Sequence, residues 1–204
     1  MSTGLRFTLE VDGLPPDAFA VVSFHLNQSL SSLFSLDLSL VSQQFLSLEF
    51  AQVLDKMAYL TVWQGDDVQR RVKGVVTWFE LGENDKNQML YSMKVCPPLW
   101  RIGLRQNFRI FQNEDIESIL ATILKENGVT EWSPLFSEPH PWPGRRIVLT
   151  GHPQANLNRE WQVVASDLHG EQPQAVPGRR GSGTTLENHF AVIPADRTWR
   201  PQPL

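Results

Sequence analysis

The sequence predicts a mainly β protein of antiparallel strands, folded as a barrel or sandwich, with one or two short helices. The first observation is strict alternation of apolar and polar residues, clearest in 34–40, where Phe34, Leu36, Leu38 and Leu40 are separated by small polar residues. Successive side chains of a strand point to opposite faces, so this segment offers one face to a core and one to water. The second observation is that only one stretch repeats its apolar residues at the helical period.

Seven strands are expected in the first half of the chain, at 4–11, 18–28, 34–43, 57–64, 69–82, 88–96 and 105–111. Turn-forming residues separate them, among them Leu14-Pro15-Pro16-Asp17, Gly65-Asp66-Asp67 and Gly82-Glu83-Asn84-Asp85. Because these connections are short, we expect consecutive strands to be neighbours in a meander. Segment 48–54 is interpreted as a short helix or a turn.

One helix is predicted at 113–127. Asn113 suits the N-cap position, and Gly128 supplies the usual stop after the last turn. The apolar residues between them recur at helical spacing and form one stripe: Ile116, Ile119, Leu120, Ile123 and Leu124. An isolated amphipathic helix after many strands is expected to plug the open end or side of a barrel.

The chain changes character after Val129. Residues 130–145 are rich in proline and show almost no periodicity, and strands resume at 146–150, 160–168 and 186–194. The last piece of about 60 residues is too short to bury a core alone. The predicted division is therefore a first barrel domain at 1–139, with the plugging helix 113–127, and strands at 140–204 that complete the barrel or belong to a second one.

Composition excludes several classes of function. The formal net charge is −4 and the basic residues are scattered, which gives no electrostatic reason to bind nucleic acid. The single cysteine, Cys96, is expected to be a buried thiol. Neither a signal peptide nor an apolar run of membrane-spanning length is found, so synthesis and folding in the cytoplasm are expected.

No catalytic, metal-binding or cofactor-binding residues are predicted. His152, His169 and His189 fall on successive elements, but their spacing is not that of a zinc site, and surface histidines are the preferred interpretation. The carboxylates near strand ends (Glu10, Asp12, Glu80, Glu83) are candidates for a glycosidase-like pair, and none is marked out. A set of aromatics suits a sugar-stacking platform, although core packing is favoured: Trp63, Trp78, Phe79, Trp100 and Phe108.

Two stretches resemble a known family. One runs from Phe108-Arg109-Ile110-Phe111-Gln112-Asn113 through the helix to Gly128. The other begins at Asn158-Arg159-Glu160-Trp161, continues through His169-Gly170-Glu171 and Leu186–Ala195, and ends at Trp199-Arg200-Pro201. Both are similar to the tail-hub region of type VI secretion spike proteins, the VgrG family, and so are the turn at 14–16 and the strand 34–40. The resemblance covers nearly the whole chain.

The resemblance implies a structural component rather than an enzyme, with barrel-like tail-hub domains. It implies a homotrimer whose base docks on the hexameric tube protein Hcp, with baseplate components and effectors as further partners. Assembly in the cytoplasm and export through the type VI apparatus without a signal peptide follow from the same resemblance. The tip that meets the target membrane is expected to lie outside this sequence.

Two departures from the family pattern are evident. The family has a long stretch between the regions that here read Leu135–His140 and Arg145–Leu149, which in this sequence are nearly adjacent. We therefore expect a missing segment, visible as one overlong backbone step within 139–144. The second departure is that the sequence stops at Leu204, before the needle-like region of the family.

Two alternatives stay open. A contractile phage or tailocin baseplate hub has the same sequence features, and neighbouring genes for a tube and a sheath would favour either hub over other classes. The alternative of another class is a cell-wall or carbohydrate hydrolase. Two carboxylates roughly 5–10 Å apart in an open cleft would favour it.

Overall fold

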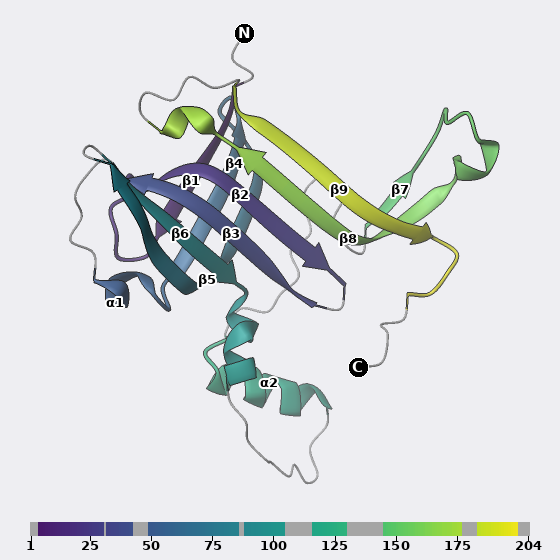
Figure 1. The fold of residues 1–204 in the computed structure, drawn as a ribbon. Coiled ribbons are helices and arrows are strands. Elements are labelled where there is room, and N and C mark those ends of the chain that lie inside the picture. The colour runs from purple at the N-terminus through teal and green to yellow at the C-terminus, as the bar shows by residue number, and fades with distance from the viewer. Residues whose placement is uncertain are drawn as a thin grey trace.

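The computed structural model describes residues 4–30, 32–42, 49–85, 88–104, 116–129, 145–176 and 183–199. Within these ranges strands far outnumber helices, so the predicted fold class is confirmed (Figure 1). The strands are β1 (Leu5–Val11), β2 (Ala20–Ser29), β3 (Ser32–Ser42), β4 (Met57–Gln64), β5 (Asp67–Asp85), β6 (Gln88–Cys96), β7 (Arg146–Val148), β8 (Glu160–Glu171) and β9 (Thr185–Pro194). The helices are α1 (Phe50–Val53) and α2 (Ile116–Glu126), with short 3₁₀ turns η1 (Pro98–Leu104), η2 (Ala155–Leu157) and η3 (Pro173–Ala175).

Six strands close into an antiparallel barrel in the order β1-β4-β5-β6-β3-β2, and a pairing of Thr8 with Ala20 joins β2 back to β1. The expected meander is correct for β4, β5 and β6, but β1 pairs with β4 and β3 pairs with β6. β1 and β2 pair only at Thr8 and Ala20, because the connection formed by residues 12–19 separates the two strands along the rest of their length. Phe19 in this connection is buried against Tyr91 of β6, with ring centroids 5.4 Å apart.

The barrel interior is filled by its own side chains. Phe7 and Phe24 meet edge to face at 5.0 Å, and Phe79 stacks on Tyr91 at 5.2 Å. Arg70 is also buried, and its Nη2 donates a hydrogen bond to Gln28 Oε1. A six-stranded barrel is too narrow to hold anything besides such side chains. The core therefore lies inside the closed barrel.

The predicted helix exists, but it lies outside the barrel. Helix α2 occupies Ile116–Glu126, while the expected start at 113–115 is outside the described residues. Figure 1 shows α2 below the barrel, beyond η1. Arg101 of η1 donates to Asp55 Oδ1 at 2.8 Å and so ties η1 to the turn before β4. The helix does not enter the barrel interior, which is already filled, and its expected role in closing the open end or side stays a prediction.

Strands β7, β8 and β9 form an extension of the barrel sheet. Residues Ser23–Ser29 of β2 pair with Glu171–Ala165 of β8, along the edge of β2 that β1 leaves open. β9 pairs with β8 along its length, and β7 pairs with the start of β8. The barrel thus closes without residues 140–204. The second-domain assignment stays a prediction, and the expected break within 139–144 and the strand 105–111 lie outside the described residues.

Candidate functional site

The outward side chains of five neighbouring strands form two rows that cross the sheet from β8 through β2, β3 and β6 to β5. The first, here called the histidine row, consists of His169, His25, Asp37, Lys94 and Trp78. The second, here called the serine row, consists of Glu171, Ser23, Ser39, Ser92 and Glu80. Both rows arise because polar residues alternate with core residues along each strand and directly paired residues share a face.

Most charged groups of the histidine row are paired. Lys94 Nζ lies 3.2 Å from Asp37 Oδ1, and His25 Nε2 contacts Asp167 Oδ1 of β8. His169 lies 3.2 Å from Glu171 Oε1, and its ring meets that of His25 at 5.8 Å. All these groups are partly exposed, so the pairs contribute little to stability. The Lys94–Asp37 pair places opposite charges next to each other in the histidine row.

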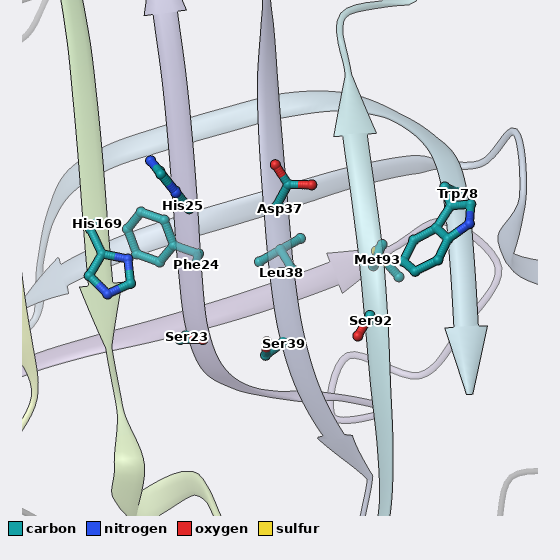
Figure 2. A pocket seen from close by; sticks show the side chains of 10 residues that line it. All are labelled: Ser23, Phe24, His25, Asp37, Leu38, Ser39, Trp78, Ser92, Met93 and His169. Carbon is teal, nitrogen blue, oxygen red and sulfur yellow. The ribbon is translucent and has the colours of Figure 1, made fainter. Parts of the chain in front are cut away.

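A trough of about 200 Å³ lies between the two rows. Figure 2 shows Ser23, Ser39 and Ser92 side by side along one side of it, with Trp78 at one end and His169 at the other. Trp78 is 46 % exposed, although its size makes burial the usual outcome. Asp37 is the one carboxylate among the lining residues.

The structure places the candidate histidines differently from the sequence expectation. His169 and His189 lie on the adjacent strands β8 and β9, whereas His152 lies in the loop before β8 and accepts a hydrogen bond from the backbone of Gln154. The partner of His169 is instead His25, which sequence reasoning missed because β2 is distant in the chain. Within the described ranges, no three His, Cys, Asp or Glu side chains are arranged to hold a metal ion.

The candidate carboxylates are not brought together. Glu10 of β1 faces Tyr59 of β4, while Glu80 faces Ser92 of β6 in the serine row. Asp12 lies in the turn after β1, and the side chain of Glu83 is outside the described residues. The described structure therefore provides no support for a glycosidase-like pair among these residues.

The aromatic candidates divide between core and surface. Phe79 is buried, as core packing predicts. Trp63 is half-buried, with Arg6 over its ring at 4.6 Å and a 2.9 Å hydrogen bond from Nε1 to Thr8 Oγ1. Trp100 is also half-buried, Phe108 is outside the described residues, and Trp78 contradicts the expectation of core packing.

Exposed apolar side chains also occur on the extension and next to it: Val148, Leu149, Phe190 and Trp199. β9 pairs only with β8, so its other edge carries backbone groups without a strand partner in the described structure. No helix in the described ranges is long and apolar enough to cross a membrane, and Cys96 is a buried free thiol as expected.

The described structure is a closed six-stranded antiparallel barrel whose sheet is extended by β8, β9 and β7. Residues 27–138, more than half of the chain, match the phage tail baseplate hub (GPD) family. The chain belongs to this family.

Relatives among type VI secretion spike proteins are similar over most of the chain. The spike protein VgrG2a of Pseudomonas aeruginosa is 35% identical over 136 residues, which are 67% of this chain and 16% of that protein. The actin cross-linking toxin VgrG1 of Vibrio cholerae is 30% identical over 138 residues, covering 63% of this chain and 12% of that protein. The chain thus spans less than a fifth of the length of these relatives.

A solved structure confirms the fold. The Escherichia coli protein c3393 is described as a type VI secretion component with structural similarity to the T4 bacteriophage tail proteins gp27 and gp5. It matches with a TM-score of 0.72 at 14% identity, over 95% of this chain and 79% of that chain. The resemblance to the VgrG family is therefore confirmed by sequence and by fold.

Proposed function

We propose that this chain is the hub of a type VI secretion spike and acts by assembly rather than by catalysis. The observation that carries the proposal is the 35% identity to a spike protein over two thirds of the chain, joined to a barrel that matches a type VI component. The hub is a homotrimer, docks on the hexameric tube protein Hcp and carries the puncturing tip that delivers effectors. It assembles in the cytoplasm with baseplate components and leaves through the type VI apparatus.

The extension supports trimer formation. Its open β9 edge and exposed apolar side chains are features that a neighbouring subunit covers in an assembled ring. A three-fold ring has heterologous contacts, in which one surface of a subunit meets a different surface of the next. A contractile phage or tailocin baseplate hub is the second candidate, favoured by the family match itself.

The test is the mass and symmetry of the natural full-length product, measured by light scattering and electron microscopy with and without Hcp. We expect a trimer with a three-fold spike that binds the tube protein at one end. Phe190→Glu on β9 is expected to lower the mass to that of smaller species. Leu104→Glu is the matched control, because Leu104 is a 65 % exposed apolar residue on η1, away from the extension. A stable monomer or dimer of the unmodified full-length product would contradict the proposal.

A further inference from the structure

We propose that the trough beside Trp78 binds a neutral saccharide, with one sugar ring stacked on the indole and its hydroxyl groups directed toward the serine row. The proposal concerns the outer face of the barrel and does not depend on the spike role. Four observations carry it: the exposed indole, the three serine hydroxyls, the Lys94–Asp37 ion pair beside the indole, and the volume of the trough.

The indole of Trp78 is an apolar platform in polar surroundings. It projects from β5 on the outer face, 46 % exposed, opposite Lys94 of β6. The face of an aromatic ring carries partial negative charge and attracts the weakly positive C–H groups of a partner. A pyranose ring presents such C–H groups on one face and hydroxyl groups around its rim. Trp78 therefore matches one face of a sugar.

Three hydroxyl groups lie beside this platform. Ser23, Ser39 and Ser92 are directly paired across β2, β3 and β6, so their side chains lie in a line along the trough (Figure 2). Within the described residues, these hydroxyls have no hydrogen-bond partner from the protein. Each can both donate and accept a hydrogen bond, which is what a sugar hydroxyl also does.

The charges around the trough favour a neutral ligand. Lys94, next to Trp78, disfavours a cation on the ring, and Asp37, paired with Lys94 at 3.2 Å, disfavours an anion. His25 Nε2 contacts Asp167 Oδ1 on the same face. Oxygen and nitrogen atoms of these pairs retain the capacity to bind a hydroxyl group, because a carboxylate accepts several hydrogen bonds and an ammonium donates three.

The size of the trough suits a single sugar ring. Its volume is about 200 Å³, below the roughly 300–1,000 Å³ of typical small-molecule sites. We expect a dissociation constant on the order of 1 mM for a monosaccharide. The trough binds rather than cleaves, because glycoside hydrolysis ordinarily uses two carboxyl groups and Asp37 is the one carboxylate among its described lining residues.

The test uses the 204-residue chain labelled with 5-fluorotryptophan and followed by ¹⁹F NMR, with the Trp78 resonance assigned from Trp78→Phe. The probes are glucose, galactose and N-acetylglucosamine, with cationic glucosamine as the charged counterpart. We expect at least one neutral sugar to shift the Trp78 resonance saturably and more tightly than glucosamine does. No shift from any neutral sugar, or tighter binding of glucosamine, would overturn the proposal.

Two variants and a control complete the test. Ser39→Val keeps Trp78 and fills the centre of the serine row, so we expect at least a tenfold rise in the dissociation constant, read at the same resonance. Trp78→Ala is expected to abolish binding, measured by calorimetry on the folded variant. Trp199→Ala, at another exposed tryptophan, is expected to leave the affinity unchanged. Undiminished binding by Ser39→Val would overturn the proposal even if Trp78→Ala does not fold.

Discussion

The closed barrel and the β7–β9 extension are built from similar strands but bury their side chains very differently. Every barrel strand contributes residues to one continuous core, including Phe7, Leu26, Leu36, Leu60 and Met93. β9 has no buried residue along its ten positions, and β7 has none either. In β8, the buried residues include Leu168, which pairs with Leu26 of the barrel.

The difference shows what closure contributes. A closed barrel pairs every strand on both edges and encloses an inner face. The extension is a single layer that borrows one edge from β2 and leaves another edge open. The stability of the extension therefore depends on the barrel and on whatever covers its exposed side. The barrel supplies almost all of its own core, to which β8 adds Leu168. Four predictions test this comparison.

The largest effect is expected from Phe7→Ala. Phe7 is 3 % exposed and its ring contacts that of Phe24 inside the barrel. Removing a buried phenylalanine side chain typically costs about 3–5 kcal/mol of unfolding free energy, because a cavity remains. Urea unfolding of the whole chain measures this change. A loss under about 1 kcal/mol would mean that the barrel interior is not the main source of stability.

A smaller effect is expected at the junction, from Gly170→Ala. A Cβ atom at Gly170 would lie 2.3 Å from Cε1 of Phe24, so ring or strand must move. Overpacking of this kind typically costs about 1–3 kcal/mol. We expect β8 to move rather than the well-packed barrel. Amide hydrogen exchange should therefore accelerate more in β8 and β9 than in the barrel strands.

The matched control for the junction is Gly183→Ala, where a Cβ atom would meet nothing within 4 Å. Its exchange rates should equal those of the unmodified chain. Equal behaviour of the two alanine variants would show that contact between Phe24 and β8 does not hold the extension in place.

The third prediction concerns the effect of alkaline pH on the buried Tyr91 of β6. Burial raises the pKa of the Tyr91 phenol above its usual value of 10.0. The protonated phenol stabilises the folded protein fully at pH values below the pKa that Tyr91 has in the unfolded chain. This stabilisation is lost as the pH rises toward the pKa of Tyr91 in the folded protein, because the unfolded chain releases the proton first. The unfolding free energy should therefore fall above about pH 10, and the fall should be weaker in Tyr91→Phe. Identical pH profiles for the two proteins would contradict this.

The smallest effect is expected from Phe190→Ala, which makes the same substitution as Phe7→Ala in the extension. Phe190 is 44 % exposed on β9. Surface substitutions away from special features usually change the unfolding free energy by less than about 0.5 kcal/mol. A loss as large as that of Phe7→Ala, in the same urea experiment, would mean that this side chain is buried in solution.

The alternation of residues predicted which side chains face inward, and in β3 it did so correctly for Leu36, Leu38 and Leu40. It could not predict which residues lie opposite one another, because β1–β4 and β3–β6 join strands that are not consecutive. The two rows of the outer face depend on that register. The sequence shows the polar residues of each strand, but it does not show which of them lie opposite one another on neighbouring strands.

Two residues contradict the rule that large apolar groups are inside and charges outside. Arg70 is buried in the barrel beside Gln28, and Trp78 is exposed on the surface. Strand alternation around Trp78 is interrupted by a register shift between Val76 and Trp78, which turns the indole outward. A single sequence carries no clear signal for such a bulge. It therefore predicts the strands but not the trough.

The pairing of β2 with β8 also sets an order of folding. His25 and Asp167, which meet across this pairing, are 142 residues apart in the chain. Closing so long a loop costs entropy before any contact is formed, and such non-local pairings slow folding. All six barrel strands lie within residues 5–96 and can pair while the rest of the chain is still being synthesised. β8 then pairs with an edge of β2 that is already formed, so the extension folds after the barrel and is expected to open more readily than the barrel.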